Sequence, residues 1–373
     1  MGLYFRNLDG MRFIAALFVI IGHCQHVMLD APVNILAYSP WGQKLAGFGV
    51  DFFFVLSGFL ISFFLLKEIS EKNTISIRKF YFRRILRLWP LYFIVGFGGL
   101  LSAEPILRWL GMVDQSPTAS EWVHNITYLL FFGINFQTLL GQMNDYSSAI
   151  LGHFWSLAVE EQFYLIWAPL LLLFRKHLPL LLLSMCIIGY TTTMFQPEIF
   201  NDWFAENASS SAVFFTSNRF FHFGLGATIA YLVEKKYLME LPIFVSIVVQ
   251  LAFILPGVNY LFGNHFYSIA PERIINGLIS AGLILMAITR YSLFPFEIPT
   301  LKYFGKISFG IYIFHMFALR VSFKLLSEFG FNTQYIAFRI LFPFLSTVIA
   351  LLLASISYEY LEKRFLELKK RYK

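Results

Sequence analysis

An arginine and a histidine share one face of the first long apolar stretch. Arg12 and His23 are eleven residues apart, which is three turns of an α-helix and about 16 Å along its axis. A neutral imidazole can accept a proton from a hydroxyl group, so His23 is a candidate general base. The alternative is a histidine that packs between helices and is hydrogen-bonded there. Cys24 points in another direction from the helix, which disfavours a thiol nucleophile beside His23.

Carboxylates lie in two further apolar stretches. Asp51 lies near one end of its stretch, where it could orient a histidine or stabilise the dipole of its own helix by about 0.3–1 kcal/mol. Glu160 lies roughly 13 Å inside its stretch, and Glu161 should face another way because successive helical residues point about 100° apart. A buried carboxylate needs a partner. We expect one glutamate to meet His23 and the other an arginine, with a structural ion pair as the alternative for either.

Basic residues are dense in segment 67–87. Arg84 and Arg87 are three residues apart and share a helix face, and guanidinium groups bind phosphates bidentately. We therefore expect Arg83, Arg84 and Arg87, together with Arg12, to bind the phosphates of a nucleotide-containing co-substrate. The alternative is anchoring at the membrane surface, with contacts to anionic lipids.

Four other polar side chains interrupt apolar stretches. Arg219 and His315 could line a polar cavity and contact a substrate, or each could be a hydrogen-bonded residue of the core. Tyr164 and Ser57 are candidate hydrogen-bond donors to a substrate and to an oxyanion that develops on it. We expect Arg219, Tyr164 and His315 to bind substrate.

The composition places these residues in a membrane protein. Hydrophobic residues make up 58% of the 373 residues and charged residues 14%, against about 25% charged in a soluble domain, and the mean hydropathy is +0.65. The net charge of +7 comes from basic residues at the ends of apolar segments. This pattern indicates orientation in a membrane and contact with lipids, and no nucleic-acid partner. The two cysteines form neither a disulfide framework nor a metal cluster, and no metal is expected.

The elements that must position these residues are long apolar helices, since a spanning helix needs about 20 apolar residues. Segment 123–140 contains His124, Asn125, Asn135 and Gln137, so we expect it to be re-entrant or interfacial. The sequence otherwise predicts an all-α bundle of about ten transmembrane helices, near residues 10–28, 48–66, 88–104, 151–174, 178–196, 211–233, 237–256, 273–291, 303–321 and 337–360.

The charges predict the orientation of the bundle. The acidic loop 197–210 should lie outside the cell. Basic stretches should lie in the cytoplasm with both termini, and these are 67–87, 175–176, 235–236 and 363–373. We expect residues 1–373 to form a single membrane-embedded domain with no appended soluble domain.

Six strings in this order resemble the acyltransferase-3 family of integral membrane O-acyltransferases: LDGMRFIAALFVIIGHC, GVDFFFVLSGFLIS, FYFRRILRLWPLY, HFWSLAVEEQFYL, RFFHFGLGA and FGKISFGIYIFHM. The resemblance implies transfer of an acyl group, usually acetyl, from cytosolic acyl-CoA to a hydroxyl of an extracytoplasmic glycan or lipid-linked sugar. It implies a bacterial cytoplasmic membrane. The family's Arg-x10-His motif falls on Arg12 and His23, its Arg-x-x-Arg motif on Arg84 and Arg87, and its glutamate on Glu160. At the tail, Arg364 stands where the family has proline.

These expectations combine into one hypothesis. The arginines hold the phosphates of acetyl-CoA, His23 takes the proton of the acceptor hydroxyl, and Glu160 or Asp51 orients the imidazole. General-base catalysis of this kind contributes about 10²–10⁴-fold. The alternative is a transporter or proton-coupled carrier that uses the same buried polar residues. Turnover of acyl-CoA by the purified protein distinguishes the two classes.

Overall fold

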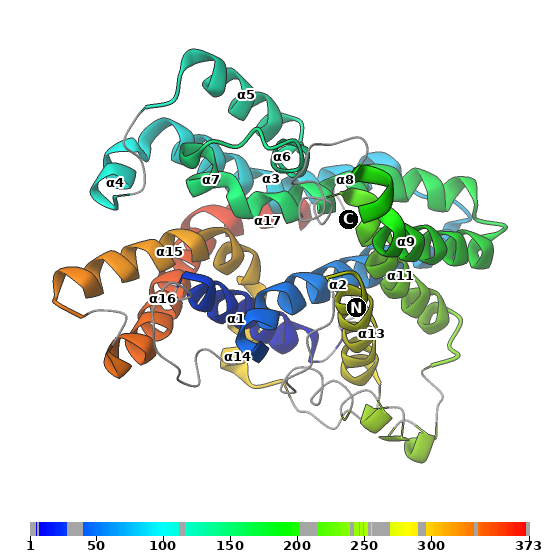
Figure 1. Ribbon diagram of the computed structural model, residues 1–373. Coiled ribbons are helices and arrows are strands. Elements are labelled where there is room, and N and C mark those ends of the chain that lie inside the picture. Colours follow the sequence, from blue (N-terminus) through cyan, green and yellow to red (C-terminus); the bar gives the residue numbers. More distant parts are fainter. Residues whose placement is uncertain are drawn as a thin grey trace.

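The chain is a helical membrane protein. The computed structural model describes residues 5, 7–27, 40–111, 116–201, 215–238, parts of 242–255, 269–289, 296–331 and 335–370, and the regular structure within these residues is helical (Figure 1).

Eight helical segments of the described residues are long and apolar enough to cross a membrane. They are α1 (Leu8–Val27), α2 (Pro40–Lys72), α3 (Ile77–Ser102), the run of α7 (Asp145–Leu151), η2 (Gly152–Phe154) and α8 (Trp155–Leu173), then α9 (Leu178–Asn201), α13 (Ile269–Ile288), α15 (Ser308–Glu328), and α16 (Ile336–Ser357) continued by the π-helical η5 (Tyr358–Glu362) and α17 (Lys363–Lys370). These segments confirm eight of the predicted spans.

The remaining predicted spans differ in detail. The 211–233 span corresponds to η4 (Thr216–Arg219) and α11 (Phe220–Glu234). At 15 residues, α11 is about 22 Å long, shorter than the hydrocarbon core of about 30 Å. The 237–256 span lies largely outside the described residues.

The prediction of one continuous span over 303–321 is wrong at its start. A short amphipathic helix, α14 (Pro299–Lys306), ends there, and the apolar helix begins at Ser308. Gly305 packs directly on α1, because a Cβ at this position would lie 1.8 Å from the backbone oxygen of Asp9. The turn between α14 and α15 therefore fixes the beginning of α1, where Arg12 lies.

Segment 123–140 does not form a spanning helix. It divides into α5 (Ala119–Leu130) and α6 (Ile134–Leu139), with Phe132 between them in the left-handed region at φ 52°. The buried amides pair with one another, since Gln137 Nε2 donates to Asn125 Oδ1 at 2.6 Å. Burial of these amides in protein is what allows polar groups in such a segment, whereas His124 is exposed.

Helix α2 is the centre of the bundle, and it packs against α1, α8, α11 and α13 (Figure 1). Its contact with α11 depends on glycine, because a Cβ at Gly226 would lie 2.0 Å from the backbone oxygen of Val55. Small residues allow membrane helices to approach closely when burial from water drives no association.

Helix α1 joins two parts of the core. One side of it packs against α2, and the other against α14, α15 and α16. At the cytoplasmic end predicted from the sequence, α17 packs against α3, so the basic residues of both helices lie on the same side. The two ends of α1 therefore lie in different surroundings. Arg12 lies near its N-terminal end and His23 near its C-terminal end.

Candidate active site

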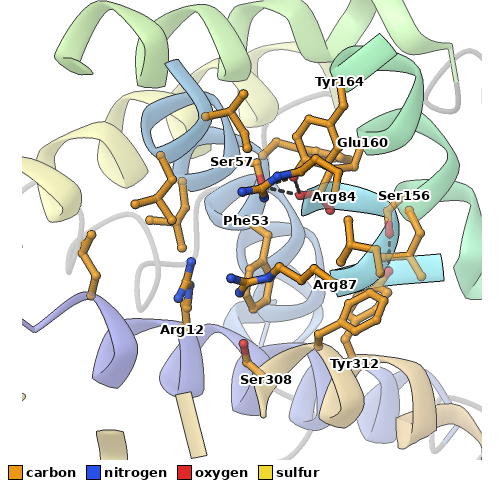
Figure 2. Close-up of a pocket in the computed structure, with 18 of the residues that line it drawn as sticks. Arg12, Phe53, Ser57, Arg84, Arg87, Ser156, Glu160, Tyr164, Ser308 and Tyr312 are labelled. Carbon is orange, nitrogen blue, oxygen red and sulfur yellow. Dashed lines mark hydrogen bonds between the residues drawn. The ribbon is translucent and has the colours of Figure 1, made fainter. Parts of the chain in front are cut away.

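A cavity of about 270 Å³ opens between α1, α2, α3, α8 and α15 (Figure 2). Most of its wall is apolar, with Leu8, Phe53, Leu60, Leu88 and Phe309 among the residues that line it. Polar groups interrupt this wall at a group of arginines, at Glu160 with its two hydroxyl donors, and at a tyrosine–serine pair. An apolar cavity with a few convergent polar groups is typical of a small-molecule site.

Three arginines face the cavity. Figure 2 shows the guanidinium groups of Arg12, Arg84 and Arg87 directed into it from α1 and α3. Arg12 donates to Asp9 at 3.0 Å. Arg84 is half-buried, and its buried Nε has no hydrogen-bond partner. Arg83 does not line the cavity, because it projects about 100° away from Arg84 on the same helix.

Glu160 also lines the cavity, and it is held by two hydroxyl groups. Ser57 and Tyr164 both donate to its Oε1, and the guanidinium of Arg84 lies 5.7 Å from the centre of the Tyr164 ring. Ser57 and Tyr164 are therefore engaged with Glu160. The three arginines exceed the two lining carboxylates, Asp9 and Glu160, so the charged groups of this wall suit an anion.

The neighbouring glutamate faces away from this cavity wall, as the helical geometry predicts. Glu161 accepts a hydrogen bond from Trp89 Nε1 at 3.0 Å. Its other oxygen is buried without a partner. The two carboxylates thus lie in different surroundings, because Glu160 faces the cavity and Glu161 faces α3.

A tyrosine and a serine close one side of the cavity. The hydroxyl groups of Tyr312 and Ser156 are 2.5 Å apart, and the Tyr312 hydroxyl donates to the backbone oxygen of His153 at 3.0 Å. Both side chains line the cavity (Figure 2). The Tyr312 ring is also 5.2 Å from the ring of His315. Tyr312 therefore stands between the cavity and a group of imidazoles.

Those imidazoles come from three separate elements. The ring centres of His23 and His315 are 5.0 Å apart, and those of His315 and His153 are 5.1 Å apart. His23 Nδ1 lies 2.9 Å from the backbone oxygen of Val19, and a carbonyl only accepts, so this nitrogen carries the proton. His23 does not itself line the cavity. The structure brings His315 to His23, an association that helical spacing could not reveal.

Asp51 lies in a different group of charges. It is fully buried and accepts from Arg219 at 2.7 Å, from Asn276 at 3.0 Å and from Arg273 at 3.4 Å. His222 Nε2 is 3.6 Å from the same carboxylate. These residues come from α2, η4, α11 and α13, so Asp51 ties four elements together.

This arrangement corrects the expectation that Asp51 or Glu160 orients the imidazole of His23. Asp51 meets two arginines and Glu160 meets two hydroxyls, and neither carboxylate is placed on His23. The cause is tertiary packing, since η4 and α13 bring Arg219 and Arg273, which are far away in sequence, to Asp51 on α2. Arg219 is fully buried in this group, with its guanidinium between the rings of Phe54 and Trp155 at 5.2 Å from each. It does not line the cavity near Arg84.

Sequence reasoning missed several residues of these groups. Tyr312 lies three residues before His315, so it is one turn away on the same helix, and this spacing could have identified it. His153 and Ser156 lie in the string HFWSLAVEEQFYL beside Glu160. No local signal marks Arg273 and Asn276, which lie on α13 and reach Asp51 only through packing.

Comparison with known proteins agrees with this architecture. The family model described as an acyltransferase domain matches residues 5–358. A Staphylococcus aureus (strain COL) protein with a provisional O-acetyltransferase name is 29% identical over 344 residues, covering 84% of this chain and 50% of that protein. Peptidoglycan O-acetyltransferase OatA of Listeria monocytogenes is 28% identical over 335 residues, with 84% and 49% covered.

A third relative, O-acetyltransferase OatA of Staphylococcus aureus (strain NCTC 8325 / PS 47), is 26% identical over 343 residues, with 84% of this chain and 50% of the relative covered. The chain thus spans about half the length of the curated relatives it matches. No solved structure matches it. Because the family model covers nearly the whole chain, the protein belongs to the acyltransferase-3 family.

Proposed function

We propose that this protein is a membrane O-acyltransferase that moves an acyl group, acetyl in the first instance, from acyl-CoA to a hydroxyl of a glycan. The observation that carries the proposal is one continuous arrangement. Three guanidinium groups face an apolar cavity, and the tyrosine that closes this cavity is in ring contact with the imidazole next to His23. The O-acetyltransferase names of the relatives support the same reaction class.

The arginines provide the donor site in this proposal. Arg12, Arg84 and Arg87 bind the phosphates of acyl-CoA, since guanidinium groups form charge-assisted, bidentate hydrogen bonds with phosphate. The apolar wall from Phe53 and Leu60 accommodates the uncharged arm that carries the thioester. Glu160, held by its two hydroxyl donors, balances part of the positive charge of Arg84. It is a positioning residue here.

His23 acts as the general base. Its Nδ1 proton is directed to the Val19 carbonyl, so Nε2 is the ring nitrogen that carries the lone pair, and we assign it to take the proton of the acceptor hydroxyl. The hydroxyl oxygen then forms a bond with the acyl carbon while the carbon–sulfur bond breaks. The proton on His23 finally passes to the departing sulfur. Tyr312 and Ser156 lie between the cavity and His23. Their side chains must therefore move aside before the thioester can reach His23.

The proposed location is the bacterial cytoplasmic membrane, with the arginines facing the cytoplasm where acyl-CoA is made. The basic residues of α17 and the start of α3 lie on one side, in agreement with this orientation. The acceptor is a glycan on the opposite side, and peptidoglycan is the first to test because one relative bears that name.

The test is release of free coenzyme A thiol from acetyl-CoA by the protein purified in detergent, measured with soluble peptidoglycan fragments present. Wild-type protein should release thiol and form O-acetyl esters. His23→Asn should lower the rate about 10²–10⁴-fold, because asparagine can still donate to the Val19 carbonyl but cannot take a proton. A protein that leaves acetyl-CoA intact is a carrier, and wild-type turnover by the variant would refute His23 as the base.

A further inference from the structure

Two hydroxyl groups meet at the end of the cavity that faces the imidazoles. The hydroxyl oxygens of Tyr312 on α15 and Ser156 on α8 are 2.5 Å apart, and both side chains line the cavity (Figure 2). Tyr312 is also in ring contact with His315, whose ring centre is 5.0 Å from that of His23. A thioester in the cavity must therefore pass these hydroxyls to reach the base.

Acyl transfer needs a hydrogen-bond donor as well as a base. When an oxygen attacks the thioester, negative charge develops on its carbonyl oxygen, and donors aimed at that oxygen stabilise the transition state. Ser57 and Tyr164, the donors expected from the sequence, are hydrogen-bonded to Glu160. Ser308 also lines the cavity, but it lies about two helical turns before His315 on α15. The position of this donor is therefore open.

The hydrogen bonds of the hydroxyl pair leave one hydrogen to spare. The pair carries two hydroxyl hydrogens. Within the described part of the chain it has one acceptor outside itself, the backbone oxygen of His153, which is 3.0 Å from the Tyr312 hydroxyl and 3.4 Å from Ser156 Oγ. One hydrogen bonds this carbonyl, and the other lies between the two hydroxyls. Because hydroxyl hydrogens rotate, the second can turn to a carbonyl oxygen in the cavity while the bond to His153 remains.

We propose that the hydroxyl pair of Tyr312 and Ser156 donates the hydrogen bond that stabilises the oxyanion of the reacting thioester. The inference rests on the proposed acyl transfer and extends it. As the acceptor oxygen bonds to the acyl carbon, an electron pair of the C=O bond moves to the carbonyl oxygen, which accepts from the pair. The C=O bond then re-forms as the carbon–sulfur bond breaks, and the sulfur leaves with the proton from His23. Both hydroxyls keep their own hydrogens throughout.

The movement that admits the thioester also frees this donor. Tyr312 and Ser156 belong to different helices, and their mutual hydrogen bond closes the cavity toward His23. When a carbonyl oxygen takes up the spare hydrogen, the bond lost on opening is regained in contact with the substrate. Hydrogen bonds to a charged acceptor are roughly twice as strong as those between neutral groups. The pair therefore stabilises the transition state more than the bound thioester, as catalysis requires.

The experiment measures kcat and KM for acetyl-CoA in Ser156→Ala, Tyr312→Phe and the double variant, as acetyl transfer to soluble peptidoglycan fragments by protein in detergent. Each single variant leaves one hydroxyl for the His153 carbonyl and no spare hydrogen. We expect kcat to fall about 10²–10³-fold, the effect of removing one oxyanion donor, with KM near wild type. The double variant should lose little more than either single variant, because the spare hydrogen is already gone.

Tyr92→Phe and Ser322→Ala are the matched controls. Tyr92 is a buried tyrosine whose hydroxyl donates to the backbone oxygen of Leu129 at 3.4 Å. Ser322 is a buried serine of α15 whose hydroxyl donates to the backbone oxygen of Ala318 at 2.7 Å. Neither side chain lines the cavity, so kcat should stay near wild type in both controls.

Each outcome decides for or against the shared donor. A wild-type kcat in Ser156→Ala overturns it, and so do losses in the single variants that multiply in the double variant. A raised KM with an unchanged kcat also overturns it, because the pair would then bind substrate and transition state equally. An equal loss of kcat in the controls would assign the effect to packing. Ser156→Ala decides alone if Tyr312→Phe does not fold. If wild-type protein releases no thiol from acetyl-CoA, the proposed acyl transfer itself fails.

Discussion

Arginines cluster in two places inside this bundle, and their surroundings differ. At the cavity, Arg12, Arg84 and Arg87 point into shared open space (Figure 2). In the Asp51 group, Arg219 and Arg273 converge on one carboxylate. The residue types are the same in both places.

The difference between the two groups of arginines indicates which of them can bind an anion. Guanidinium groups that already surround a carboxylate stabilise the junction of α2, η4 and α13. Guanidinium groups that face a cavity can bind an anion that enters it. Charged groups inside membrane proteins are functional by default, but this default does not separate the two kinds. The direction of the side chain and its partners do.

The largest expected effect separates the two groups by stability. Asp51→Asn leaves Arg219 and Arg273 buried around a neutral amide, and removal of one partner of a buried pair costs about 3–5 kcal/mol. We expect a lower midpoint of thermal unfolding in detergent and less folded protein. Asp51→Asn combined with Arg219→Gln should recover part of the loss, because both charges are then gone. A variant that stays as stable as wild type but loses turnover would place Asp51 in the reaction.

The next effect separates the groups by binding. Arg84→Ala should raise the KM for acetyl-CoA roughly 10–100-fold, since a hydrogen bond to a charged group contributes about 1.5–3 kcal/mol. Thermal stability should remain near wild type because the guanidinium faces the cavity. Arg83→Ala is the matched control, with the same charge change one residue away and outside the cavity lining. Equal effects of the two variants would mean that this segment acts through general attraction to the membrane or the donor.

Much of the fold could be predicted because it depends on local sequence. Apolar length predicted ten spans, and eight of them correspond to long apolar helices among the described residues. The amides of segment 123–140 predicted that it would not cross as one helix. The break between α14 and α15 was missed, because it depends on the packing of Gly305 against Asp9 and no local signal reports that contact. Local sequence propensity predicts that a helix forms, whereas the end of α14 depends on its packing against α1.

The same distinction applies to the site. Arg84 and Arg87 were expected on one face, and both line the cavity, because spacing within a helix fixes relative direction. The partners of His23 and Asp51 could not be predicted, since His315 and Arg219 come from distant helices. Which of two buried cations meets a carboxylate is decided by helix packing. The sequence therefore predicted which residues share a helix face better than it predicted their partners on other helices.

The smallest expected effect tests whether the Asp51 group is separate from the cavity that we propose binds acyl-CoA. Asn276→Ala removes one hydrogen bond of 3.0 Å to Asp51, while both arginines remain in contact with the carboxylate. The loss should be near the lower end for a hydrogen bond to a charged group, about 1.5 kcal/mol, and visible as a small decrease in the unfolding midpoint. The KM for acetyl-CoA should be unchanged, because Asn276 lies outside the lining of the cavity. A raised KM in this variant, measured with the same assay as Arg84→Ala, would show that the two groups of arginines act as one site.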